Sequence, residues 1–198
     1  MEFTCSVLTD NAKEALTNLF DNLSDPKVTK RCSVHIHLNI YDLNEYRIWN
    51  IIYLYLIFEK AFYKISGNRW SSNYCVPLQT FLFQKPQFDK LPNILKKYSG
   101  LHILADNRLS TLEFRHMHGS TDIEEILNWI KVIQYLYEGS VYSNKGFFEE
   151  VIPNLRTNSY YWKILDDTFK DLAWKFKYPE VKNDIEYGIT HTKLLIMT

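Results

Sequence analysis

The stretch SVHIHLN at residues 33–39 alternates apolar and polar side chains, the pattern of a β-strand with one buried face. Its aliphatic residues would point to one side of a sheet, and His35 and His37 would point to the other. Two imidazoles on one face could bind a metal ion or a phosphate. The alternative is a pair of half-exposed strand histidines. The pattern predicts a strand from about Cys32 to Ile40.

A second stretch, TLEFR at residues 111–115, repeats this arrangement. Glu113 and Arg115 share one face, and apolar side chains occupy the other. A carboxylate is a hard oxygen ligand for Mg²⁺, and a guanidinium grips phosphate oxygens. The alternative is an ordinary Glu–Arg pair across a sheet. We expect both stretches to lie in one sheet, arranged to hold a metal ion and an anion.

Hydrophobic periodicity predicts the remaining elements, and their order favours an α+β fold with an antiparallel sheet and helices packed on one face. The predicted elements are a strand at 2–8, a helix at 11–23 capped by Asp10, a central helix at 43–65 ending at Gly67, a hairpin of 101–104 and 110–117 with Asp106-Asn107 in its turn, a helix from the Thr121–Glu124 capping box to about 137, a helix at 159–176 and a last strand at 190–196.

Composition bounds the class of protein. The 198 residues suit one domain, and the balance of 23 basic and 23 acidic residues gives no general attraction for nucleic acid. The most apolar run, residues 48–58, is too short to span a membrane. Three widely spaced cysteines favour a reducing, cytoplasmic location, with a virion or an organelle as alternatives. The abundance of Ile, Asn, Lys and Tyr indicates an AT-rich source such as a phage, virus or organelle.

The sequence was compared with common nucleotide-binding and catalytic motifs. The sequence contains no Walker loop, GxGxxG, GxSxG or HExxH. Between the two site strands lies the loop RWSSNYCVP at residues 69–77. We expect Arg69 to enter the same cleft as the site strands and Tyr74 to support it.

Taken together, these segments resemble the amidoligase family, ATP-dependent carboxylate–amine ligases thought to share the catalytic fold of glutamine synthetase. The resemblance covers about residues 1–140, and its motifs occur in the family's order. They are VHIHL at 34–38, the aromatic-rich helix after it, RWSSNYCVP at 69–77, TLEFR at 111–115 running into GSTD at 119–122, and NWI at 128–130.

The resemblance implies a role for each matching residue. His35 and His37 would line the nucleotide and metal site, and Glu113 would be a Mg²⁺ ligand. Arg69 and Arg115 would stabilise the transferring γ-phosphoryl group, with Arg115 also contacting the nucleotide. ATP and Mg²⁺ would be the cofactors, and the reaction would join a carboxylate to an amine.

One departure from the family concerns the acidic ligands. Family members begin with a Gly-x-Glu-x-Glu strand whose carboxylates hold the metals, whereas MEFTCS at residues 1–6 resembles a later strand. Glu2 would then be a remaining acidic ligand beside Glu113 and His35. We therefore expect a ligase chain that needs a partner for full activity. The alternative is a non-catalytic structural or interaction subunit that reuses the fold.

The chain is expected to divide into an amidoligase-like part, residues 1–140, and a helical C-terminal extension, residues 141–198, packed on the same domain. The extension is rich in aromatic residues, which serve core packing or an interface. A protein partner, or a second copy, is expected to bind through the first strand and these aromatics.

Overall fold

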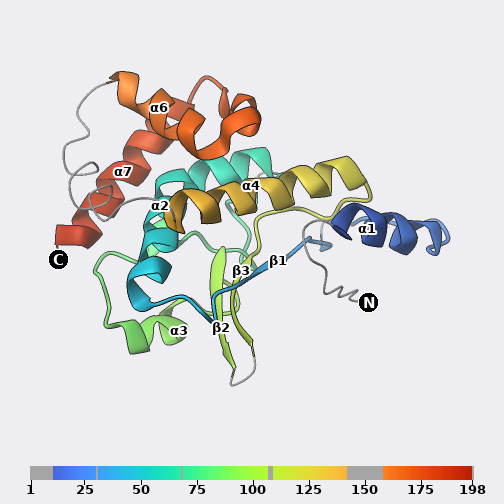
Figure 1. Ribbon diagram of the computed structural model, residues 1–198, viewed down its shortest axis with the longest axis horizontal. Helices are drawn as coiled ribbons and strands as arrows, with labels where there is room; N and C mark the ends of the chain where they lie inside the picture. The colour runs from blue at the N-terminus through green and yellow to red at the C-terminus, as the bar shows by residue number, and fades with distance from the viewer. Residues whose placement is uncertain (1–10, 30, 68, 107–108, 142–157, 198) are drawn as a thin grey trace.

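The computed structural model describes residues 11–29, 31–67, 69–106, 109–141 and 158–197 (Figure 1). Within these ranges the chain forms six α-helices and one three-stranded antiparallel sheet, so the predicted α+β class is confirmed. The strand predicted at residues 2–8 and the predicted helix cap Asp10 lie outside the described residues.

Most predicted helices, and the hairpin, occur close to their expected positions. The elements are α1 Ala12–Asp21, β1 Ile36–Asn39, α2 Glu45–Ile65, η2 Leu78–Thr80, η3 Phe88–Lys90, α3 Leu91–Ile94, β2 Leu101–Asp106, β3 Leu109–Phe114, α4 Ile123–Val141, α6 Asn158–Phe169, η5 Lys170–Phe176 and α7 Val181–Met197.

The sheet has the order β1-β3-β2, with β3 in the centre and both neighbours antiparallel to it. Leu112 and Phe114 of β3 are fully buried, and the Phe114 ring meets Tyr55 of α2 edge-on at 6.1 Å. The apolar face of the sheet therefore packs on α2. Strand β1 is shorter than predicted, because the described segment before it pairs with the segment after β3 only at the isolated bridge between Ser33 and His118.

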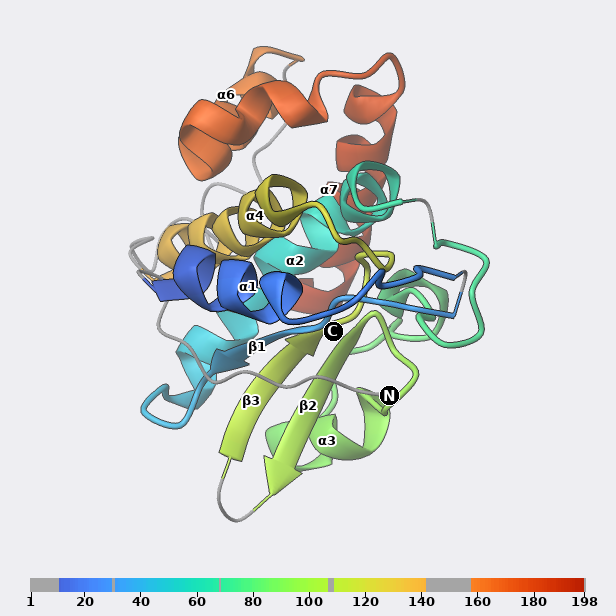
Figure 2. The same ribbon diagram turned by 90° about the vertical axis from the view of Figure 1, so that its right-hand side faces the viewer.

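Helix α2 runs through the middle of the molecule, with the sheet on one side and α4 and α7 packed against it (Figure 2). Fifteen of its 21 residues are buried, which explains why its sequence is apolar on nearly every side. Asn44 caps its start by accepting a hydrogen bond from the Arg47 amide. Gly67 follows its end with φ of 103°, where a Cβ would overlap the His118 ring.

Helix α4 begins one residue later than the capping box predicts. The Asp122 side chain, rather than Thr121, accepts a hydrogen bond from an amide of the first turn, that of Glu125 at 3.1 Å. Ser120, which precedes the helix, donates a hydrogen bond to the Glu125 carboxylate. Asp122 is thus the helix cap, and Ser120 is bound to a side chain of the same first turn.

The predicted last strand at residues 190–196 is wrong, because these residues belong to α7. Ile185, Ile189 and Thr192 are buried at helical spacing. Gly188 lies where α7 crosses α2, since a Cβ there would overlap the Ile57 carbonyl oxygen. Close contact between the two helix backbones therefore decides the structure of this segment.

The helix predicted at residues 159–176 is interrupted. Helix α6 ends at Phe169, and the 3-10 helix η5 begins at Lys170, whose φ is 48°. The interruption brings the Phe169 and Phe176 rings into a stack with centroids 4.2 Å apart. Burial of two aromatic rings compensates the strained residue.

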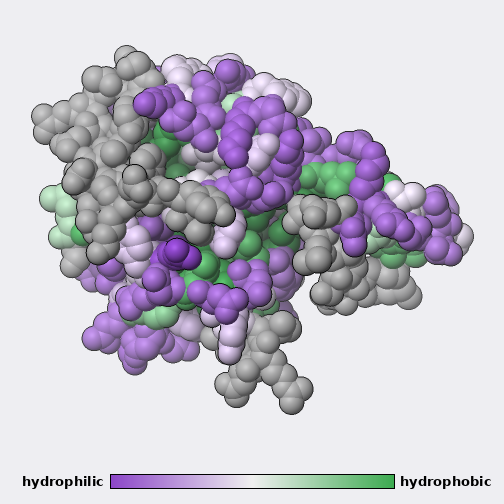
Figure 3. All heavy atoms as spheres, viewed as in Figure 1, coloured by the Kyte–Doolittle hydropathy of each residue, from purple (hydrophilic) through white to green (hydrophobic). Residues whose placement is uncertain are grey.

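Polar residues dominate the described part of one face of the molecule. The face drawn in Figure 3 is covered largely by hydrophilic residues, with hydrophobic ones showing in seams between the elements. Among the described helices, none combines the length and the apolar character that a membrane crossing requires.

Candidate functional site

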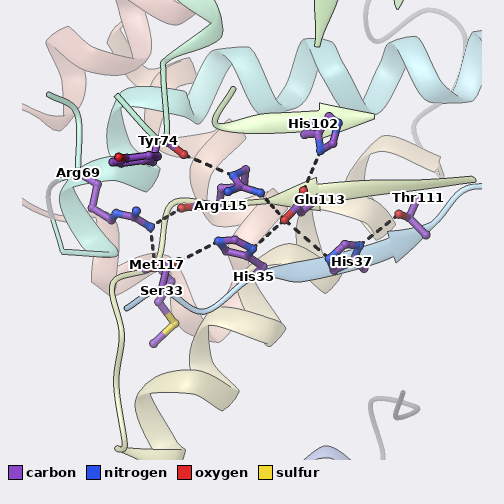
Figure 4. Close-up of polar contacts among 10 residues, drawn as sticks. All are labelled: Ser33, His35, His37, Arg69, Tyr74, His102, Thr111, Glu113, Arg115 and Met117. Atoms are coloured by element: carbon purple, nitrogen blue, oxygen red, sulfur yellow. Dashed lines mark hydrogen bonds and ion pairs between the residues drawn. The ribbon is translucent and has the colours of Figure 1, made fainter. Parts of the chain in front are cut away.

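Five side chains gather on the polar face of the sheet, and we call them the Glu113 cluster: Glu113, His35, His37, His102 and Arg115 (Figure 4). The strand register explains three of them. Glu113 on central strand β3 lies directly opposite His37 on β1 and opposite His102 on β2. Cross-strand partners project to the same face, so two imidazoles flank one carboxylate.

The Glu113 carboxylate is surrounded by nitrogen donors at short range. Its Oε1 lies 2.7 Å from Nδ1 of His35, 2.6 Å from Nη1 of Arg115 and 3.8 Å from Nε2 of His37. Its Oε2 lies 2.8 Å from Nδ1 of His102. Glu113 is buried, so the carboxylate exchanges contact with water for contact with these groups.

The outer nitrogens of two histidines are also engaged. Nε2 of His35 lies 2.8 Å from the Ser33 hydroxyl, and Nδ1 of His37 lies 3.3 Å from the Thr111 hydroxyl. An ionised carboxylate only accepts hydrogen bonds, so Nδ1 of His35 must carry a proton to donate to Glu113. The same argument places a proton on Nδ1 of His102.

Burial alone would raise the pKa of Glu113, but hydrogen bonds from His35, His102 and Arg115 outweigh it and hold that pKa well below its usual range. Glu113 is therefore ionised throughout the physiological range. The pKa of His37 is lowered, first by burial and then by the neighbouring His35, His102 and Arg115, against the opposing effect of Glu113. His37 thus remains a neutral imidazole at neutral pH.

Arg69 approaches the cluster from the loop after α2. Its Nη1 donates to the backbone carbonyls of Arg115, at 2.9 Å, and Met117, at 3.3 Å. Arg69 therefore lies beside the site, where it holds the end of β3 in place. The Tyr74 carbonyl accepts from Nε of Arg115 at 3.4 Å, and Tyr74 as a residue is 64% exposed. The hydrogen bond with this loop thus supports Arg115, and support of Arg69 by Tyr74 stays a prediction.

A buried polar network in α2 lies beneath this loop. Glu59 is completely buried and accepts hydrogen bonds from the Tyr55 hydroxyl and from the amides of Leu78 and Gln79. Burial outweighs these bonds and raises the pKa of Glu59 to about 7. Tyr63, one turn further along α2, donates to the Cys75 carbonyl at 2.7 Å. One face of α2 therefore anchors the loop that carries Tyr74.

The same network reaches the residue after Arg115. Tyr55 gives its proton to Glu59, so it accepts from Nε2–H of His116 at 2.9 Å. Burial and the charge of Arg69 lower the pKa of His116 to about 3, so this ring is neutral. Its Nδ1 has no hydrogen-bond partner among the described residues. Gly100 lies against the Tyr55 and Tyr63 hydroxyls, where a Cβ would not fit.

The structure brings together four residues singled out from the sequence: His35, His37, Glu113 and Arg115. Sequence reasoning missed His102. The predicted hairpin contained the signal, since β2 and β3 are connected through residues 107–108 and this register sets His102 opposite Glu113. Placing the turn at Asp106-Asn107 hid that pairing. Glu2, the second predicted metal ligand, lies outside the described residues.

The described part of the site does not by itself fit Mg²⁺. This ion prefers oxygen ligands at about 2.0–2.1 Å. The Glu113 cluster offers one carboxylate, and both its oxygens already accept hydrogen bonds. Within the described residues, no group of three or more His, Cys, Asp and Glu side chains has a geometry that could hold a metal ion. The nitrogen donors fit an oxyanion better.

Comparison with known proteins decides the family. Residues 1–137 match the family model described as "Putative amidoligase enzyme". The chain belongs to this amidoligase family. Comparisons with curated proteins and with solved structures found no match. The matched residues include every member of the Glu113 cluster and Arg69, whereas α6 and α7 lie beyond them.

Proposed function

We propose that this amidoligase-family chain takes part in ATP-dependent ligation of a carboxylate to an amine. The observation that carries the proposal is the convergence of Arg115 and three histidines on one face of the sheet, within the family-matching residues. We also propose that this sheet corresponds to part of a glutamine synthetase-like catalytic sheet, which the family match and the antiparallel order support.

In the proposed reaction, a substrate carboxylate oxygen attacks the γ-phosphorus of ATP. The bond to the β–γ bridging oxygen breaks, ADP leaves, and an acyl phosphate forms. An amine then attacks the acyl carbon, phosphate leaves with the bonding electrons, and the nitrogen loses a proton to give the amide. Such phosphoryl transfer depends mainly on positioning and charge stabilisation.

Each site residue has a proposed role in these steps. Arg115 would contact the oxygens of the transferring phosphoryl group, and His35 and His37 would line the nucleotide site. Arg69 would position Arg115 by holding its backbone carbonyl. Because the one carboxylate of the Glu113 cluster already accepts hydrogen bonds at both oxygens, acidic ligands for a nucleotide-bound Mg²⁺ would come from elsewhere, from Glu2 or from a partner polypeptide.

The first test is binding of a non-hydrolysable ATP analogue to the purified chain, with and without Mg²⁺, by isothermal titration calorimetry. Arg115→Ala should weaken binding by about 10- to 100-fold, the usual effect of losing a charged hydrogen bond. Arg47→Ala is the control, because Arg47 is an exposed arginine in the first turn of α2. Equal binding by both variants would contradict the role of Arg115.

The second test is turnover. Hydroxylamine intercepts acyl phosphates and yields hydroxamates, so ADP and hydroxamate formation can be followed with amino acids and peptides as carboxylate donors. We expect turnover to be low for the chain alone and to rise when a partner supplies acidic ligands for Mg²⁺. A chain that binds no nucleotide under any condition would fit the non-catalytic alternative instead.

A further inference from the structure

The arrangement around Glu113 has the form of an occupied anion site. Donors from three different segments point at one carboxylate: His35 before β1, His102 on β2 and Arg115 after β3. All three donor side chains are partly or largely buried, and the Glu113 side chain is 7% exposed. A preformed set of converging donors is how proteins bind phosphoryl and carboxylate groups.

The contacts also show why this carboxylate is poorly suited to hold a metal ion in the state described. Oε1 accepts from two donors within 2.7 Å, and Oε2 accepts from a third at 2.8 Å. A cation at this position would have to displace these donors, and their positive or partly positive hydrogens would face it. An entering oxyanion would instead meet the same hydrogens with its own acceptor atoms.

We propose that His35, His102 and Arg115 form a binding site for an oxyanion group, phosphoryl or carboxylate, and that the Glu113 carboxylate is its internal occupant. The ligand's oxyanion takes the place of Glu113, whose side chain rotates away. This inference deepens the proposed function and rests on it only for the source of the oxyanion. In that setting, Glu113 holds the donors in place until the substrate arrives and competes with it.

The proposal and the metal-ligand role predict opposite effects of removing the Glu113 charge. If Glu113 is an internal occupant, its removal strengthens anion binding, because the donors lose their competitor. If Glu113 is a metal ligand and the three donors form no oxyanion site, its removal abolishes Mg²⁺ binding and raises anion binding in the absence of metal no more than removal of Glu125 does.

The experiment measures binding of inorganic phosphate and of acetate, by calorimetry and thermal shift, in the presence of EDTA. The proteins are the wild type, Glu113→Ala, Glu113→Gln and Glu125→Ala. Glu125 is the matched control, since its Oε1 lies 3.6 Å from Nε2 of His118 in a more exposed carboxylate–histidine pair. Its removal changes the net charge equally.

We expect Glu113→Ala to bind phosphate at least about tenfold more tightly than Glu125→Ala or the wild type, as loss of a competing charge-assisted contact predicts. Glu113→Gln should show a smaller gain in the same direction. It retains the size of the side chain, so it tests the proposal even if the alanine variant is poorly folded by circular dichroism. Adding Arg115→Ala to Glu113→Gln should remove the gain.

Two results would overturn the proposal. One is phosphate and acetate binding by both Glu113 variants that is no tighter than in Glu125→Ala. The other is thermal stabilisation by Mg²⁺, without EDTA or phosphate, in the wild type and Glu125→Ala but in neither Glu113 variant. Acetate binding without phosphate binding would identify the substrate carboxylate as the oxyanion. A gain in anion binding without any ATP-analogue binding would leave this inference standing and refute the proposed function.

Discussion

The buried carboxylate of Glu59 should make the stability of this protein depend on pH in an unusual direction. Burial raises its pKa from the ordinary 4.5 to about 7. Between these values the unfolded chain releases the Glu59 proton while the folded chain keeps it. Stability from this group is therefore fully present below about pH 4.5 and is lost as the pH rises towards 7, the opposite of a salt-bridged carboxylate.

The magnitude follows from the two pKa values. Between about pH 5 and about pH 8, this linkage should lower the free energy of unfolding by about 2 to 3 kcal/mol. Glu59→Gln cannot ionise, so it should lack this dependence. The substitution also lowers the free energy of unfolding by an amount that does not change with pH, because the amide NH₂ of Gln and the Gln79 N–H are both donors and cannot hydrogen-bond to each other. The wild type should thus be more stable than Glu59→Gln at the lower pH, and this difference in the free energy of unfolding should vanish or reverse at the higher pH.

Urea unfolding followed by tryptophan fluorescence at both pH values measures the difference between wild type and variant, which cancels the other titrating groups. Glu14→Gln, on an exposed position of α1, is the control and should show no such trend. A difference between wild type and Glu59→Gln that is constant with pH, or that grows as the pH rises, would refute the reasoning. It would mean that the three hydrogen bonds to Glu59 outweigh its burial.

Other changes test the helix crossing and the site. Gly188→Ala should lower the free energy of unfolding by about 1–3 kcal/mol or more, because the new Cβ would overlap the Ile57 carbonyl. Gly139→Ala should cost less, because its Cβ would lie 3.3 Å from the Leu54 side chain. Equal losses of the two variants in urea unfolding would contradict the close crossing of α7 and α2. Arg69→Ala should reduce both the free energy of unfolding and the free energy of ATP-analogue binding by about 1–3 kcal/mol, because Arg69 holds the Arg115 carbonyl. A variant with neither effect would contradict this positioning role. The stability advantage of wild type over Glu113→Gln should shrink as the pH falls below about 4.5, because the pKa of Glu113 is depressed; an advantage that persists in acid contradicts this.

Strand alternation, with both stretches expected in one sheet, was enough to predict four of the five side chains of the Glu113 cluster. His35, His37, Glu113 and Arg115 could be grouped because a strand sends every second side chain to one face. His102 could not be grouped in the same way. No second candidate site residue was recognised on β2, and only the exact register of the hairpin places His102 beside Glu113. Register depends on the turn, which short-range patterns specify weakly.

The C-terminal segment shows a different limit. Residues 190–196 contain threonines and a run of aliphatic residues, which favour a strand in isolation. Their helical structure depends on packing against α2, at a crossing that requires Gly188. The contact between Gly188 and Ile57 joins residues more than a hundred positions apart, so it cannot be predicted from a local sequence pattern. Likewise, the resemblance placed Arg69 near Arg115 but gave no hint that it would grip backbone carbonyls.

Helix α7 lies beyond residue 137, where the family match ends, and yet it covers α2. A chain cut after that residue would expose to water a helix that is apolar on nearly every side. Such a surface favours aggregation. A fragment of this protein trimmed to residues 1–137, the stretch that matches the family, should therefore precipitate, because it lacks the helix that covers α2.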